Sequence, residues 1–95
     1  MKEIRRTAEF DVWLDGLRDR VTRLRITQRL QRLEAGNYGD YKRFSGLVEL
    51  RLDFGPGYRL YCVERGNILV VVLAGGTKAS QEWDIARAVK MAATV

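Results

Sequence analysis

The stretch VELRLDFGPGYRLY, residues 48–61, alternates apolar with charged side chains as far as Phe54 and then reaches a Gly-Pro-Gly turn. Alternation with a period of two is typical of a strand with one buried face. Gly55-Pro56-Gly57 is a strong turn signal, and residues 58–64 supply the returning strand. The sequence therefore predicts an antiparallel hairpin at the centre of the fold.

The register expected for this hairpin gathers polar side chains on one face of the sheet. The expected cross-strand pairs are Phe54 with Tyr58, Asp53 with Arg59, and Arg51 with Tyr61. The polar residues sharing a face are then Glu49, Arg51, Asp53, Arg59 and Tyr61. Such a face suits a phosphodiester, and a solvated ladder of ion pairs is the alternative interpretation. A slip of one residue would turn Arg59 and Tyr61 to the other face.

After the hairpin, residues 68–74 are apolar throughout, as expected of a central strand covered on both faces. We expect Gly75-Gly76 to end this strand and Ser80 to cap a last helix. The apolar side of that helix carries Ile85, Ala88, Val89 and Ala92.

Before the hairpin, the pattern predicts a short edge strand at residues 2–6 and two helices. Thr7 is the expected N-cap of the first helix, whose apolar face carries Phe10, Trp13, Leu14 and Leu17. The second helix spans residues 19–35 and stops at Gly36-Asn37. The predicted order is β-α-α-β-β-β-α. This is an α+β fold with an antiparallel-dominated sheet, two N-terminal helices and a C-terminal helix.

The second helix has two apolar sides, one with Val21 and Leu24 and the other with Ile26, Leu30 and Leu33. Either it packs on the sheet and also on the first helix or a partner, or its two halves use different faces of a small core. A stripe of arginines lies between the two sides: Arg18, Arg25, Arg29 and Arg32. The stripe is either a solvated face or a binding surface.

Composition limits the functional classes. The chain has 95 residues, enough for one domain, and 17 Lys and Arg against 12 Asp and Glu, a net charge of +5. This excess favours a polyanionic partner, either a nucleic acid or an acidic protein. Without histidine, and with Cys62 as the one cysteine, neither His-dependent catalysis nor a usual zinc site is available, and we expect no metal and no cofactor. The absence of a disulfide partner for Cys62 and of a long apolar segment predicts a bacterial cytoplasmic protein that does not enter a membrane.

Four stretches together carry a family resemblance: FDVWLDGL (10–17), RITQRLQRLEAGNYGD (25–40), VELRLDFGPGYRLY (48–61) and LAGGTKASQEWDI (73–85). They resemble the phage-derived addiction-module-killer branch of the RelE/ParE toxins, related to HigB, over nearly the whole chain. The resemblance implies a single toxin domain at residues 1–95. Ribonuclease members of that superfamily cut mRNA, usually on the ribosome, by attack of a ribose 2′-OH on the adjoining phosphate and without a metal.

The resemblance also implies roles for particular residues. The family's catalytic arginine corresponds to Arg59, the basic residue on the preceding strand to Arg51, a neighbouring catalytic-strand position to Glu49, and the basic residue after the last strand to Lys78. The substrate-binding residues expected alongside them are Tyr61, Asp84, Arg29 and Arg32. Many relatives carry an acid–base Tyr or His where this chain has Asp84, so that role does not transfer to it.

The partners implied by the resemblance are an antitoxin with a helix-turn-helix domain, mRNA on the ribosome, and operator DNA through the antitoxin alone. Two other functions share the same fold. One is a ParE-like toxin that binds DNA gyrase without cutting RNA, and the other is a decayed module that retains only antitoxin or operator binding.

Overall fold

The predicted hairpin forms the centre of a five-stranded sheet in the computed structural model, which describes residues 1–95. β3 (Leu47–Leu52) pairs antiparallel with β4 (Tyr58–Arg65), which pairs antiparallel with β5 (Leu69–Thr77). β2 (Tyr41–Phe44) is the antiparallel edge strand beside β3, and β1 (Glu3–Arg6) runs parallel to β5 at the other edge. One parallel pair among three antiparallel pairs makes the sheet mixed, and the predicted α+β class is confirmed.

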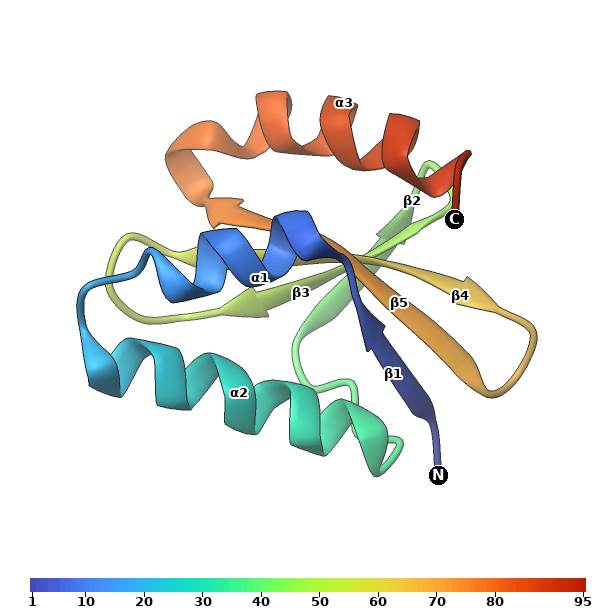
Figure 1. Ribbon diagram of the computed structural model, residues 1–95, viewed down its shortest axis with the longest axis horizontal. Coiled ribbons are helices and arrows are strands. Elements are labelled where there is room, and N and C mark those ends of the chain that lie inside the picture. Colours follow the sequence, from blue (N-terminus) through green and yellow to red (C-terminus); the bar gives the residue numbers. More distant parts are fainter.

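Helices cover both faces of this sheet. Figure 1 shows α1 (Ala8–Asp15) and α2 (Arg20–Glu34) on one side, and α3 (Gln81–Ala92) on the other. A short 3₁₀ turn, η1 (Lys78–Ser80), joins β5 to α3. The core under α1 and α2 includes Phe10, Leu14, Ile26, Leu30, Leu33, Leu50, Leu60 and Val72, and the smaller core under α3 includes Tyr61, Val63, Val71, Leu73 and Ala88. The fold is therefore a three-layer sandwich with two separate apolar layers.

Two predictions about the number and pairing of the strands were wrong. The expected order lacked β2, because this strand has only four residues and three of them are exposed, which leaves no apolar alternation to detect. The hairpin register is also shifted by two residues: Leu52 lies opposite Tyr58 and Arg51 opposite Arg59, and Asp53 lies in the loop. Because side chains alternate with a period of two, the shift keeps the predicted face for Arg51 and Arg59.

The prediction that Gly75 and Gly76 end their strand was also wrong, because both glycines lie inside β5. A Cβ atom on Gly75 would lie 2.3 Å from the Trp13 ring, and one on Gly76 would lie 1.8 Å from Asp84 Oδ2. Both distances are too short for any side chain. The glycine pair therefore allows α1 and α3 to approach β5 closely from opposite faces.

The first helix begins at its predicted cap, Thr7, and the second begins at Asp19, where its span was expected to start. Thr7 Oγ1 accepts a hydrogen bond from Phe10 N (3.0 Å), and its hydroxyl donates to the carbonyl of Leu73 in β5 (2.6 Å). Asp19 caps α2 in the same way, accepting from the amide of Val21 at 3.1 Å. A single hydroxyl thus both starts α1 and ties it to the sheet.

Only one of the two apolar sides of α2 is packed. Ile26, Leu30 and Leu33 are buried, whereas Val21 and Leu24 are 61% and 56% exposed. The helix therefore contributes one face to the core and presents the other to solvent. None of the helices is long and apolar enough to cross a membrane.

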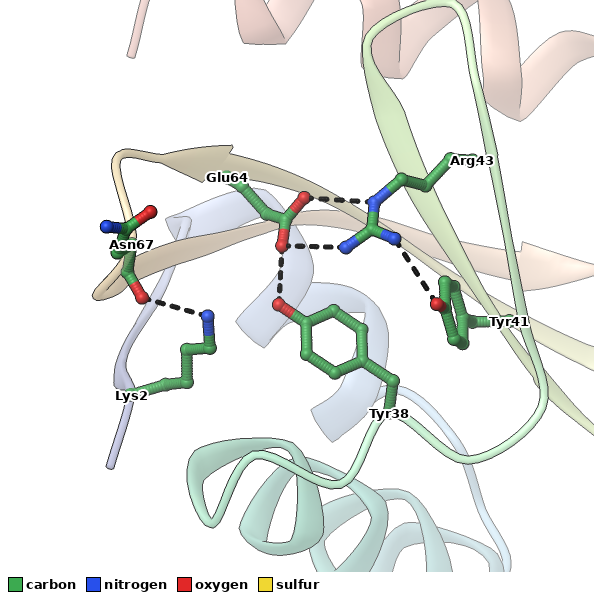
Figure 2. A network of polar contacts seen from close by, with 6 residues as sticks. All are labelled: Lys2, Tyr38, Tyr41, Arg43, Glu64 and Asn67. Carbon is green, nitrogen blue, oxygen red and sulfur yellow. Dashed lines mark hydrogen bonds and ion pairs between the residues drawn. The ribbon is translucent and has the colours of Figure 1, made fainter.

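A polar cluster beyond the C-terminal end of α2 attaches β2 to the rest of the sheet (Figure 2). Glu64 on β4 accepts hydrogen bonds from the Tyr38 hydroxyl (2.5 Å) and from Arg43 Nε and Nη2 (3.3 and 3.2 Å). Lys2 and Arg43 both lie near the Tyr38 ring, 5.7 and 5.5 Å from its centroid. These bonds hold the pKa of Glu64 below its usual range, because Arg43 and then Tyr38 stabilise the carboxylate.

We expect Thr7→Ala to lower the free energy of unfolding by about 1–2 kcal/mol, because it removes the cap of α1 and the bond to Leu73. Thr7→Ser keeps the hydroxyl and should retain most of that stability. Urea denaturation of the three proteins measures the difference. Equal losses for Ala and Ser would mean that the threonine methyl group, and not the hydroxyl, matters.

We also expect Glu64→Gln to destabilise the protein at neutral pH but not in acid. A carboxyl whose pKa is lowered by folding contributes stability above its unfolded pKa of about 4.3, and that contribution is lost as the pH falls through the folded value. The gap between parent and variant in urea midpoints should therefore close below about pH 4. A gap that stayed constant with pH would contradict a charged role for Glu64.

Candidate functional site

The polar half of the sheet face under α3 holds four of the eight predicted site residues. Arg51 on β3 lies directly opposite Arg59 on β4, and Glu49 lies directly opposite Tyr61. The alternation that buries Leu50 and Leu60 under α1 and α2 turns these four side chains toward α3. The hairpin thus brings four predicted residues together, although in a register shifted by two.

Glu49 is fully buried, and its charge is matched by two donors. Its carboxylate accepts from Arg51 Nε at 2.9 Å and from Gln81 Nε2 at 2.7 Å. A buried carboxylate without such partners would be strongly destabilising. The hydrogen bond to Glu49 raises the pKa of Arg51, so this arginine keeps its proton. Glu49 therefore fixes the position of the Arg51 guanidinium and connects it to α3.

Arg59 is the uncompensated cation of the group. It directly faces another arginine, an arrangement that is unfavourable for like charges. Arg51 is neutralised by Glu49, but no carboxylate lies within ion-pair distance of Arg59. The side-chain hydrogen bond that Arg59 does make is to the carbonyl of Tyr58 (3.1 Å), and its Nε is buried without a partner. An anion bound at the Arg59 guanidinium would relieve the repulsion.

Tyr61 is fully buried beneath α3, and its hydroxyl has no hydrogen-bond partner. Burial raises the pKa of this phenol, the nearby carboxylates of Glu49 and Asp84 raise it further, and Arg59 opposes them. The phenol therefore stays protonated at neutral pH. In this conformation Tyr61 is a buried proton donor and not an open binding surface.

Asp84 on α3 is also buried, and its Oδ2 accepts from the Ser80 hydroxyl at 2.5 Å. Ser80 stands at the predicted cap position of α3, but its hydroxyl bonds to Asp84 and not to a backbone amide of the helix. Asp84 lies directly over Gly76, as the short distance from a Cβ there shows. The Asp84 carboxylate thus lies between α3 and β5, at the buried end of the site.

Lys78 is exposed at the start of η1, beside the hairpin loop. Its amide donates to the carbonyl of Gly57 at 2.8 Å. A Cβ atom on Gly57 would lie 3.3 Å from the Lys78 side chain and 3.6 Å from Arg59 Nη1, so both side chains pass this glycine. Arg51, Arg59 and Lys78 form what we call the basic rim. The rim borders a buried layer of Glu49, Tyr61 and Asp84.

The remaining two predicted residues, Arg29 and Arg32, lie on α2, against the opposite face of the sheet. Arg32 is exposed and lines an open groove of about 740 Å³ beside Arg25 and Phe54. The Arg25 guanidinium stacks on the Phe54 ring, with its Cζ 3.7 Å from the centroid. Neither arginine of the predicted pair joins the basic rim.

Arg29 does not fit its predicted role in RNA binding, because it is only 4% exposed and both of its Nη groups donate to backbone carbonyls. Nη1 donates to the carbonyl of Arg51 at 2.6 Å, and Nη2 donates to the carbonyls of Tyr38 (2.8 Å) and Asp40 (2.6 Å). Burial lowers the pKa of Arg29, and the neighbouring Arg32 adds to this effect. Gly39 leaves room for the guanidinium: a Cβ there would lie 2.9 Å from it.

Gln81 and Ser80 were not anticipated as site residues, yet each bonds to a buried carboxylate of the site. Gln81 belongs to the GG-x-K-x-x-Q-x-x-D-I spacing at residues 75–85, so the sequence did contain a signal for it. No group of three or more His, Cys, Asp or Glu side chains is arranged to hold a metal ion. The groups that the site presents at its edge are the cations of the basic rim.

Comparison with known proteins places the chain in a family. It is 41% identical over 87 residues to a protein of Haemophilus influenzae described as uncharacterized. The match covers 90% of this chain and 88% of that protein. No protein-family model matches the chain. The chain therefore belongs to the same family as the Haemophilus influenzae protein.

The buried contacts of Arg29 can be tested against Arg32, its exposed neighbour on α2. We expect Arg29→Met to lower the free energy of unfolding by about 2–4 kcal/mol, because it removes three hydrogen bonds that a buried guanidinium makes to backbone carbonyls. Arg32→Met removes the same charge from an exposed position and should change stability by less than about 0.5 kcal/mol. Thermal and urea denaturation measure both. Similar values for the two variants would contradict the structural role of Arg29.

Proposed function

We propose that this chain is the toxin of a bacterial type II toxin–antitoxin module and acts as a metal-independent mRNA endoribonuclease on the ribosome. The observation that carries the proposal is the uncompensated Arg59, which faces Arg51 and, like Lys78, lies beside Gly57. A chain with net charge +5 that concentrates cations around an unpaired arginine is suited to a phosphodiester. The resemblance to RelE/ParE toxins supports the same reading, as do two N-terminal helices and a C-terminal helix on opposite faces of the sheet.

The proposed reaction is an in-line attack of the ribose 2′-oxygen on the adjoining phosphorus. The bond from phosphorus to the 5′-oxygen breaks, leaving a 2′,3′-cyclic phosphate and a 5′-hydroxyl. Negative charge accumulates on the phosphoryl oxygens, and Arg59 and Arg51 are the preorganised cations that stabilise it. Lys78, exposed beside them, supplies the proton to the leaving 5′-oxygen.

The proton of the attacking 2′-OH passes to bulk water in this conformation, because the carboxylate nearest the basic rim is already occupied. Glu49 is a carboxylate on the reacting face, but Arg51 and Gln81 occupy its oxygens and α3 covers it. Glu49 therefore acts as a positioning residue for Arg51 in this conformation, and a role as general base would require the first turn of α3 to move. Substrate positioning by the ribosome would reduce the demand on any single acid or base.

The proposal extends to a helix-turn-helix antitoxin as cognate partner, to operator DNA bound only through that antitoxin, and to the bacterial cytoplasm as location. The basic surface agrees with an acidic or nucleic-acid partner.

We expect Arg59→Ala to abolish mRNA cleavage while the protein still folds, because the side chain is half-buried at the rim of the site and outside both apolar cores. Primer extension on a defined mRNA during brief induction measures cleavage, and circular dichroism checks the fold. Arg5→Ala, which removes one charge from β1 at the distant sheet edge, is the matched control and should cleave like the parent.

A folded Arg59→Ala protein that still cleaves would overturn the assignment of the site. Growth arrest by the parent without new 5′ ends would favour the gyrase-binding alternative. No arrest at all would favour a decayed module.

A further inference from the structure

Trp83 on α3 is 74% exposed, more than any other large apolar side chain except Met1. An indole buries a large area when it finds a partner, and aromatic residues left this open are typical of binding surfaces. Trp83 contributes nothing to either apolar core. Its exposure is therefore unexplained by the fold.

The indole stands between two hollows in the surface. The first, of about 680 Å³, is lined by seven consecutive or nearby residues that include Lys78, Gln81 and Trp83. The second, of about 120 Å³, is lined by Trp83, Ala86, Arg87 and Lys90. Trp83 and Ala86 line both hollows, so an extended ligand crossing from one to the other passes along these two residues, of which Trp83 has the large exposed ring.

The charges around Trp83 favour a polyanion. Lys78 lies in the first hollow, and Arg87 and Lys90 lie in the second. Against them stands Glu82 in the first hollow, and Arg87 Nη2 pairs with Glu9 Oε2 at 3.3 Å on the surface. Exposed ion pairs of this kind are weak, so Arg87 remains open to a competing phosphate.

The first hollow also adjoins the candidate site. Gln81, which lines it, donates to the buried Glu49, and Lys78 belongs to both the hollow and the basic rim. A polyanion whose phosphate lies at Arg59 can thus continue past Lys78 toward Trp83. Alternating cations and an exposed aromatic ring are the features by which proteins hold single-stranded nucleic acid.

We propose that Trp83 is a stacking platform for an unpaired base of the RNA strand, with Lys78 binding the backbone on one side of that base and Lys90 and Arg87 on the other. This inference rests on the proposed function, since it takes RNA to be the ligand of the adjacent site. It adds a binding residue outside the set implied by the family resemblance. A protein contact at Trp83 is the competing assignment.

The test measures binding separately from cleavage. A fluorescently labelled single-stranded oligoribonucleotide with 2′-O-methyl groups throughout cannot be cut by 2′-OH attack, so anisotropy reports its affinity alone. The proteins compared are the parent, Trp83→Ala, Trp83→Phe, Lys90→Ala and Val89→Ala. Val89 is the control, because it is 41% exposed on the same helix but lines neither hollow.

We expect Trp83→Ala to weaken binding by roughly 5- to 150-fold, the range that corresponds to the stacking of one base, and Trp83→Phe to recover part of the loss. Trp83→Ala should leave the salt dependence unchanged, since it removes no charge. Lys90→Ala should reduce the slope of log affinity against log salt by about 0.7, the value for one phosphate contact on a single strand. Val89→Ala should bind like the parent.

Parent-like affinity of Trp83→Ala would overturn the inference, and if the antitoxin then failed to neutralise that variant, Trp83 would be assigned to a protein contact. A parent that binds no RNA at low salt would also overturn it. Primer extension on the same variants keeps the two proposals apart. If Trp83→Ala binds RNA more weakly than the parent and the parent cuts no mRNA, the stacking site is supported and the nuclease is rejected. If the parent and Trp83→Ala cut mRNA equally and bind RNA with equal affinity, the nuclease is supported and the stacking site is rejected.

Discussion

The buried guanidinium of Arg29 is the interaction on which the geometry of the site depends. It donates to the carbonyls of Tyr38, Asp40 and Arg51, and Asp40 in turn accepts from the amide of Arg51 at 2.9 Å. One side chain of α2 thereby fixes the backbone that leads into β2 and the backbone near the end of β3. The alternation along β3 directs the side chain of Arg51 to the opposite face, where it bonds to Glu49 and faces Arg59. A cation buried against three carbonyls is costly to move, so this arrangement is rigid.

The second constraint is the close approach of helices to β5. Gly75 admits the ring of Trp13 from one face, and Gly76 admits the carboxylate of Asp84 from the other. The approach of α3 excludes water from Glu49, Tyr61 and Asp84, while Arg59 and Lys78 remain at the edge. The site therefore arranges its polar groups by depth, with two carboxyl groups and a phenol in a dry layer and cations where a large anion can reach them. Electrostatic interactions at such a boundary are stronger than in open solvent.

The inner and outer sides of α3 have different neighbours, so the helix has two roles. Its inner side, with Ala88 and Asp84, completes a core and closes the site. Its outer side carries Trp83 between two hollows bordered by cations. The helix connects the packing of the sheet face to the outer surface. In its first turn Gln81 donates to the buried Glu49 and also lines the first hollow.

Much of this protein follows from local pattern. The period of two in residues 48–61 determined which side chains share a face, and it survived a two-residue error in register because a shift by two returns each side chain to the same side. The caps Thr7 and Asp19 and the stop at Gly36 are local signals of the same kind. Tertiary structure alone decided the rest. Periodicity cannot say which arginine of a helical stripe is buried. The burial of Arg29 depends on backbone carbonyls of Tyr38, Asp40 and Arg51, which lie outside the helix and meet it only in the folded chain. Nor can periodicity say that Gly75 and Gly76 lie between two helices, because a close approach is a property of the packed layers and leaves no period in the sequence.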